Sequence, residues 1–230
     1  MTVRFQFKST TYLDVKSISI IGSFNEYHED RNPMTKSEDY WYAEIPLTSG
    51  EHYYKFLINN EFLLNDPEAN MYLPHGEDEL WSTIIINEQD QRLYNNEQYS
   101  LHIDSYAVSS SITPANIGVN KKNFNLTMDK KVVVRFGFTE IKGLHTVTTL
   151  WYNSNGKLHD VSENMLFSDE TAPDKPVFLW FWLNLDEKER EYPEGMWTVK
   201  LFIDGSYIME DQVMLTQTFT YSSKGHIYNV

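Results

Sequence analysis

The chain has 230 residues, of which 41% are hydrophobic, 15% are aromatic and none is cysteine. This length suits one large domain or two ordinary ones with a sizeable core, and the aromatic content favours β-strands. The formal net charge of -14 would repel the phosphates of nucleic acids and anionic lipids, so neither is an expected partner. Without cysteine, neither a disulfide framework nor a thiolate metal site can form.

The chain begins MTVRFQFKST, in which Val3, Phe5 and Phe7 alternate with polar residues as in a strand. This start lacks the apolar stretch of a signal peptide. No later segment approaches the ~18 consecutive apolar residues that span a bilayer. We therefore expect a cytoplasmic protein with no membrane association, and the absence of cysteine is compatible with a reducing compartment.

Alternating apolar and polar residues predict five strands in the first ninety positions. They cover 3–7, 17–21, 40–45, 52–58 and 82–86. Short strands separated by regular turn signals are typical of an antiparallel β-sandwich. Residues 87–96, NEQDQRLYNN, are polar and have little to bury, so we expect a connection between domains there.

A second series of six strands follows. They are predicted at 99–105, 131–138, 145–152, 177–185, 197–203 and 212–221, with turns at Asn155-Gly156, Glu194-Gly195 and Asp204-Gly205. Asp-Gly between LFI and SYI is a strong hairpin signal, because glycine adopts a positive φ without steric cost. The segment GMWTVKLFIDGSYIMEDQVM resembles the closing hairpin of bacterial immunoglobulin-like domains, and 109–125 is expected to be a loop.

These elements predict an all-β chain of two immunoglobulin-like, early-set type antiparallel β-sandwich domains in tandem. The expected domains are residues 1–90 and 97–230, with 87–96 as the linker. The two halves share an architecture but no repeated motif.

Three signatures in the first half occur together. They are GSFNEY at 22–27, YWYAEIPL at 40–47 and GEHYYKFLINNEF at 50–62, followed by NDP at 65–67. At this spacing, residues 1–90 resemble carbohydrate-binding module family 48, which includes the glycogen-binding module of AMP-activated protein kinase beta subunits and the N-terminal modules of glucan branching enzymes. The resemblance implies a fold directly, whereas the ligand has to be argued from the site.

A glucan site needs exposed aromatic rings that stack on the sugar faces, with polar side chains between them for the hydroxyls. In the resembled family, two tryptophans stack and a lysine and an asparagine form hydrogen bonds. The resemblance places Tyr27 and Phe62 at the tryptophans, Lys55 at the lysine and Ser82 at the asparagine. The smaller rings and the lost amide imply weak binding of an α-glucan such as glycogen or a maltooligosaccharide, because each aromatic contact is worth ~1 kcal/mol.

The same residues also have a purely structural interpretation. Tyr27 and Phe62 can pack at a strand end or loop, and Lys55 can be a solvated charge on the outer face of its strand. The protein would then be an interaction or scaffold protein whose module has lost sugar binding. Other motif residues are expected to serve the fold: Gly22, Asn25, Asp66 and Pro67 in turns, and Trp41 and Trp81 in the core, with Trp81 bordering the presumed site.

The segment FLWFWL at 178–183 is apolar on both faces of its strand. A strand of this kind is expected to be covered on both sides. One face would meet the opposing sheet, and the other would meet the first domain, a loop or another subunit. This pattern favours a protein partner or homodimer contact through Phe178, Trp180 and Trp182; a tryptophan pair that binds a ligand is the alternative.

Catalytic motifs are missing from the sequence. A glycosidase needs two carboxylates held across one bond, and no catalytic scaffold is recognisable that would place them. The seven histidines show no HExxH spacing, and neither a G-x-S-x-G elbow, a P-loop nor a dinucleotide fingerprint occurs. We therefore expect a non-catalytic protein with no cofactor and no metal site; an enzyme with an unrecognised site is the least favoured class.

Overall fold

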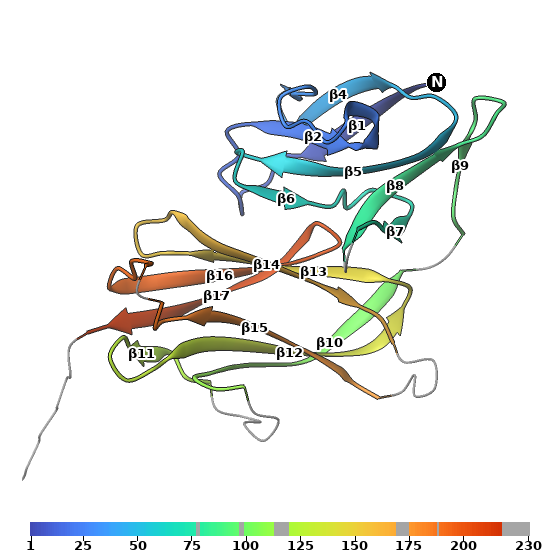
Figure 1. Cartoon of the computed structure of the whole chain (residues 1–230). Coiled ribbons are helices and arrows are strands. Elements are labelled where there is room, and N and C mark those ends of the chain that lie inside the picture. Colours follow the sequence, from blue (N-terminus) through green and yellow to red (C-terminus); the bar gives the residue numbers. More distant parts are fainter. Residues whose placement is uncertain (77–78, 97–98, 113–119, 169–174, 188, 218–230) are drawn as a thin grey trace, which may run out of the picture.

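The computed structural model describes residues 1–76, 79–96, 99–112, 120–168, 175–187 and 189–217. Within these residues every regular element is a β-strand, apart from the single 3-10 turn η1 (Ser23–Asn25). The strands form two stacked units, the N-terminal sandwich (β1–β9) and the C-terminal sandwich (β10–β17), as Figure 1 shows. The predicted all-β, immunoglobulin-like sandwich architecture is thus confirmed.

The N-terminal sandwich consists of two sheets. Its strands are β1 (Thr2–Lys8), β2 (Ile18–Gly22), β3 (Thr35–Lys36), β4 (Tyr40–Pro46), β5 (Gly50–Ile58), β6 (Phe62–Leu64), β7 (Tyr72–Pro74), β8 (Leu80–Ile86) and β9 (Arg92–Leu93). One sheet has the order β1-β4-β3 and the other β2-β5-β8-β7, with β6 on β5 and β9 on β8. Because β9 lies inside 87–96, part of the expected linker is a strand; the proposed domain boundaries stay a prediction.

The core of this sandwich follows directly from the alternation in the sequence. Val3, Phe5 and Phe7 are buried on one side of β1 while their neighbours are exposed. They pack with apolar residues of β2, β4, β5, β6 and β8 between the two sheets. Leu150 and Phe202 of the C-terminal sandwich belong to the same buried cluster, so the apolar core continues across the junction of the two units.

The C-terminal sandwich also has two sheets. Its strands are β10 (Ser100–Ser109), β11 (Asn123–Asn125), β12 (Lys131–Lys142), β13 (His145–Tyr152), β14 (Leu158–Leu166), β15 (Val177–Asn184), β16 (Gly195–Ile203) and β17 (Ser206–Thr216). The sheets have the orders β10-β12-β15 and β11-β17-β16-β13-β14. In Figure 1 the five-stranded sheet lies between the N-terminal sandwich and the three-stranded sheet.

Three expectations for the C-terminal half need adjustment. β14 was not among the predicted strands, because most of its side chains are polar. The expected loop at 109–125 contains β11, and its residues 113–119 lie outside the described residues. The last predicted strand, 212–221, is observed as the end of β17, and its residues 218–221 also lie outside the described residues.

The Asp204-Gly205 hairpin forms as predicted between β16 and β17, with positive φ of 52° and 81° at its two residues. A Cβ on Gly205 would lie 1.9 Å from the backbone oxygen of Asn65, so this turn packs tightly against the N-terminal sandwich. Asn65 also donates a hydrogen bond through Nδ2 to Thr146 Oγ1 at 3.1 Å. The two sandwiches therefore meet through specific contacts as well as through the shared core.

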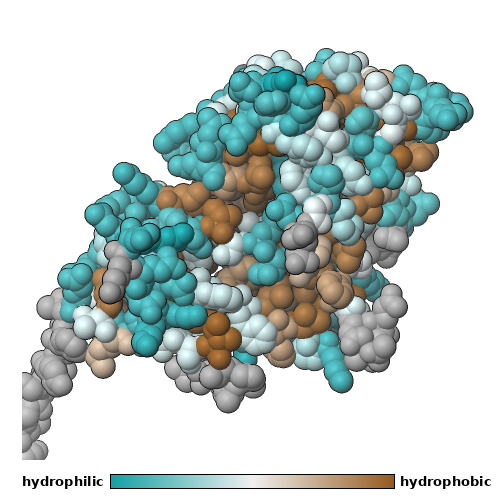
Figure 2. All heavy atoms as spheres, in the orientation of Figure 1, coloured by the Kyte–Doolittle hydropathy of each residue, from teal (hydrophilic) through white to brown (hydrophobic). Residues whose placement is uncertain are grey.

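A further contact between the sandwiches lies at their outer rim. The ring of Tyr12 stacks on that of Tyr207 with centroids 3.9 Å apart and planes inclined by 6°. Figure 2 shows hydrophobic residues in the notch between the upper and lower units, and further hydrophobic patches elsewhere on the same face among hydrophilic residues.

The 178–183 segment divides as its alternation predicts. Phe181 and Leu183 are buried in the core of the C-terminal sandwich. Phe178, Trp180 and Trp182 alternate with them on the outer face of the three-stranded sheet, where Trp182 is 41% exposed. The N-terminal sandwich packs on the other sheet and thus does not cover these rings.

Candidate functional site

The GSFNEY turn is held by a buried asparagine. Asn25 Oδ1 accepts a hydrogen bond from the Gly22 N–H at 3.0 Å, and its Nδ2 donates to the Ile20 carbonyl at 2.8 Å. A Cβ on Gly22 would lie 2.5 Å from the Tyr53 backbone oxygen, so only glycine fits here. The expected structural roles of Gly22 and Asn25 are confirmed.

This turn places Tyr27 in an unusual backbone conformation. Glu26 and Tyr27 follow η1 with φ of 57° and 60°, in the left-handed region that bulky residues rarely adopt. Such strain persists only where the surroundings impose it, and it concentrates at functional sites. Tyr27 is 39% exposed, so the turn presents its ring to solvent.

Tyr27 belongs to a group of four rings, the ring cluster, made by Tyr27, Tyr53, His75 and Trp81. His75 stacks between the two tyrosines, with centroid distances of 5.5 Å to Tyr27 and 4.3 Å to Tyr53. Trp81 meets Tyr27 edge-on at 5.5 Å. A hydrogen bond of 2.6 Å joins Tyr27 Oη to His75 Nε2, and burial raises the pKa of Tyr27, so its hydroxyl stays protonated at neutral pH.

Lys55 lies beside the ring cluster but is buried. Its Nζ is 2.7 Å from Glu163 Oε1 of β14, 3.6 Å from Glu79 Oε2, and 5.1 Å from the centroid of the Trp81 ring. Burial raises the pKa of Glu163, an effect that the Lys55 charge opposes. With 2% of its side chain exposed, Lys55 is held between the two sandwiches and is not a solvated surface charge.

Phe62 and Ser82 are buried as well. Phe62 lies opposite Ile58 in the β5–β6 pair, and both rest in the core between the two sheets. Ser82 Oγ accepts a hydrogen bond from the Asp66 N–H at 2.7 Å and donates to Asn65 Oδ1 at 3.1 Å. Their side chains support the fold of the NDP segment and of the core.

The expected surface, with exposed Tyr27 and Phe62 rings on either side of Lys55, is therefore not present in the structure. Of the four proposed ligand residues, only Tyr27 reaches solvent. Phe62 points inward because it shares the core-facing side of β6 with Leu64. Lys55 is covered because β14 contributes Glu163 directly above it. Glucan contact through Tyr27 stays a prediction.

The NDP segment and the two N-terminal tryptophans behave as structural residues. The buried Asp66 carboxylate accepts hydrogen bonds from Tyr54 Oη at 2.8 Å and from the Glu68 N–H at 2.9 Å. Burial raises the pKa of Asp66 to about 6. Trp41 and Trp81 are 7% and 8% exposed, as expected for core residues, although one edge of Trp81 meets the ring cluster.

Two residues of the ring cluster had no place in the sequence-based site. Tyr53 lies two positions before Lys55 in β5, and the two-residue period of a strand puts both on one face; this signal was present in the sequence. His75 directly follows β7, in the connection 75–79 that leads to β8, and periodicity cannot position a residue outside a strand.

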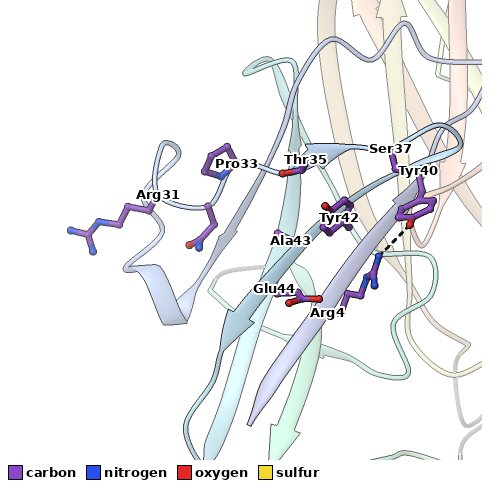
Figure 3. Close-up of a pocket in the computed structure, with 10 residues that line it drawn as sticks. Arg4, Arg31, Pro33, Thr35, Ser37, Tyr40, Tyr42, Ala43 and Glu44 are labelled. Carbon is purple, nitrogen blue, oxygen red and sulfur yellow. Dashed lines mark hydrogen bonds between the residues drawn. The ribbon is translucent and has the colours of Figure 1, made fainter.

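A separate groove of about 580 Å³ lies on the outer face of the β1-β4-β3 sheet, shown in Figure 3. Arg4 donates a hydrogen bond to Tyr40 Oη at 3.2 Å, and its guanidinium lies 4.8 Å from the centroid of the Tyr42 ring. Arg31 points away from these residues. Because Arg4 already covers the Tyr42 ring, this groove is a poorer stacking platform for a sugar than the exposed Tyr27 ring.

The described part of the chain contains no group of three or more acidic or histidine side chains placed to hold a metal ion. It also contains no helix that is long and apolar enough to cross a membrane.

Residues 3–90 match the family described as the glycogen recognition site of AMP-activated protein kinase. This match agrees with the resemblance carried by the GSFNEY, YKF and NDP motifs. The N-terminal sandwich is therefore similar to the glycogen recognition module of AMP-activated protein kinase. No curated protein sequence matches the chain.

Several solved structures share parts of the fold. An immunoglobulin-like protein from Pseudomonas aeruginosa is 20% identical, with a TM-score of 0.36 over 52% of this chain and 98% of that one. A maltogenic amylase from S. marinus is 14% identical, with a TM-score of 0.32 over 94% of this chain and 28% of that one. The Pseudomonas fluorescens alkylpurine DNA glycosylase AlkC is 15% identical, with a TM-score of 0.34 over 52% of this chain and 31% of that one. The chain thus spans less than a third of either enzyme, and likenesses at these TM-scores do not bear on function.

Proposed function

We propose that the protein is a non-catalytic binder of an α-glucan, such as glycogen or a maltooligosaccharide, through its N-terminal sandwich. The observation that supports this proposal is the ring cluster. The resemblance of the GSFNEY motif implies that Tyr27 stands at the position of a sugar-stacking tryptophan, and its ring is exposed beside His75. A pyranose ring would stack on the solvent-facing side of Tyr27, with the Tyr27 hydroxyl as a hydrogen-bond donor or acceptor.

The affinity for the sugar should be low, because other residues that the resemblance assigns to the ligand already interact within the protein. Phe62 lies in the core, and the Lys55 ammonium is paired with Glu163. A single exposed ring adds only ~1 kcal/mol beyond area burial, so we expect binding no tighter than a Kd of about 1 mM, which corresponds to about -4 kcal/mol in total. Binding of this strength becomes useful on a polymer that presents many identical sites.

The test is an NMR titration with maltoheptaose. Saturable amide shifts are expected around Tyr27, His75 and Trp81, and they should vanish in a Tyr27→Ala variant. Tyr94→Ala is the matched control, because Tyr94 is 66% exposed and lies outside the ring cluster. If several millimolar sugar leaves these amides unmoved in the unmodified protein, the α-glucan proposal is wrong.

The second candidate is an interaction or scaffold protein that retains the module fold without a sugar site. The ion pair of Lys55 with Glu163 favours it, because the side chain that the family uses for sugar hydroxyls joins the two sandwiches here. The same titration separates the two functions: the scaffold function expects no shifts around Tyr27, His75 and Trp81 at any maltooligosaccharide concentration.

A further inference from the structure

A second hollow, of about 320 Å³, lies in the C-terminal sandwich where β14 and β15 meet. β14 is the last strand of the five-stranded sheet and β15 is the last strand of the three-stranded sheet, so this is an open side of the sandwich. Its lining includes Asp160, Ser162 and Asn164 from β14, and Trp180, Trp182 and Asn184 from β15. We refer to this hollow as the tryptophan cleft.

The two tryptophans border the cleft as a stacking platform, although Lys131 Nζ lies 5.2 Å from the centroid of the Trp182 ring and leaves only its other face for a sugar. Trp180 and Trp182 are two positions apart in β15 and so share one face, while Phe181 between them fills the core. Trp182 is 41% exposed, whereas the tryptophans outside the cleft, Trp41, Trp81, Trp151 and Trp197, are at most 8% exposed. Two large rings at the rim of one hollow present more apolar area than a single exposed aromatic residue.

Hydrogen-bonding groups surround these rings. Among the described residues, neither the Trp180 nor the Trp182 indole N–H has a hydrogen-bond partner, and the Asn164 amide has none either. Asn184 Nδ2 donates to Glu187 at 2.8 Å, which orients the Asn184 side chain. Asp160 is likewise fixed, because Arg190 donates to its Oδ1 at 2.9 Å. The rim thus combines fixed polar groups with groups that remain available.

One buried donor on the same face also lacks an acceptor. Arg135 lies directly opposite Trp180 in the β12–β15 pair, and opposed residues point to the same side of a sheet. Its guanidinium lies 5.0 Å from the centroid of the Phe178 ring, the residue is 7% exposed, and its Nε has no hydrogen-bond partner among the residues that the structure describes. A buried donor left without an acceptor costs free energy, but Arg135 is not part of the lining of the cleft, so it is a neighbour of the proposed site and not a ligand contact.

We propose that the tryptophan cleft binds a neutral oligosaccharide. The faces of its pyranose rings would stack on Trp182 and Trp180, and its hydroxyls would bond Asn164 and Asn184. We expect a neutral ligand because the chain carries a net charge of -14, which disfavours an anionic sugar; the two lining carboxylates, Asp160 and Glu163, are already paired with Arg190 and Lys55. The cleft lies in a different sandwich from the ring cluster and does not depend on the function proposed for Tyr27.

The experiment follows the indole Nε1–H signals of the six tryptophans by NMR, with Trp180→Phe and Trp182→Phe variants to assign them. The probes are maltohexaose, cellohexaose, laminarihexaose and mannohexaose, with an oligogalacturonate as the acidic counterpart. We expect saturable shifts of the Trp180 and Trp182 signals with at least one neutral probe and none with the oligogalacturonate. Trp182→Ala should weaken that binding about tenfold.

Two controls keep the result specific. Phe167→Ala removes a ring that is 55% exposed and lies outside the cleft lining, and it should leave the affinity unchanged. Tyr27→Ala should also leave the Trp180 and Trp182 shifts intact, so that failure at one site is distinguishable from failure at the other. Thermal unfolding of each variant shows that it is folded before its titration is interpreted.

Three results would overturn the proposal. The first is an absence of shifts at Trp180 and Trp182 with every neutral probe at several millimolar. The second is tighter binding of the oligogalacturonate than of the neutral sugars. The third is a shift of both signals with protein concentration alone, accompanied by dimers in sedimentation, which would make this face an interface between copies of the chain.

Discussion

Lys55 and Glu163 form an ion pair across the junction of the two sandwiches, with Nζ of Lys55 in β5 lying 2.7 Å from Oε1 of Glu163 in β14. The Lys55 side chain is 2% exposed, so its charge depends on acidic partners supplied by the fold. The pair joins the strand that carries the YKF motif to an edge strand more than one hundred residues away. Lys55 therefore has a structural role in this protein. It stands at the position where the family that the N-terminal half resembles has a lysine that bonds sugar hydroxyls.

Removing the acidic partner should destabilise the protein. Glu163→Gln leaves the Lys55 ammonium buried with Glu79 as its remaining carboxylate, at 3.6 Å. We expect the free energy of unfolding to fall by about 2 kcal/mol, less than for a fully buried pair because Glu163 is partly exposed. Urea denaturation measures this change, with the exposed Glu38→Gln as control. Equal stability of the two variants would show that the ion pair contributes nothing.

Substitutions at Phe62 test whether this ring serves the core and not the sugar site. Because its ring is 5% exposed and lies in the core of the N-terminal sandwich, Phe62→Ala should cost about 3–5 kcal/mol of stability. Phe62→Leu keeps the site apolar and should remain folded with its maltoheptaose titration unchanged. A folded Phe62→Leu variant that loses sugar binding would mean that Phe62 contacts the ligand after all.

The raised pKa of Asp66 predicts that the free energy of unfolding depends on pH. Burial raises the pKa of its carboxyl from 3.8 to about 6, so between these values the folded state holds the proton more tightly than the unfolded chain. The contribution of Asp66 to stability is then complete below pH ~4 and is lost as the pH rises through about 6, an effect on the order of 3 kcal/mol. Denaturation between pH 4 and pH 7 should show this slope, and Asp66→Asn should flatten it. The exposed Asp14→Asn variant should keep the slope; if Asp66→Asn keeps it too, another group is responsible.

Alanine substitutions at Gly205 and Gly156 test how tightly the two sandwiches pack at their junction, with Gly156 as the control. Both have a positive φ, of 81° and 73°, so alanine strains the backbone at either position. A Cβ at Gly205 would also lie 1.9 Å from the Asn65 oxygen, whereas a Cβ at Gly156 would meet nothing within 4 Å. We expect Gly156→Ala to cost ~1 kcal/mol and Gly205→Ala at least twice as much, as measured by urea denaturation. Equal losses of stability in the two variants would show that the hairpin tip can shift away from Asn65 without lowering the free energy of unfolding.

Local sequence pattern predicted much of the fold. The two-residue alternation in Val3–Phe5–Phe7 and in 178–183 placed the buried and outward side chains correctly. The Asp204-Gly205 signal predicted the hairpin that forms. β14 escaped prediction because an edge strand at an open side of a sandwich needs few apolar residues, and its alternation is therefore weak.

The sequence by itself determined the all-β architecture, the turn at Gly22 and Asn25, and the likeness of residues 3–90 to a glycogen recognition module. Only the tertiary structure decided which motif residues reach solvent. Periodicity assigns a side chain to a face of its strand, but what covers that face comes from elsewhere in the chain. Lys55 is buried because Glu163 approaches from β14, and the Trp180 and Trp182 rings border a cleft because two sheet edges end beside each other.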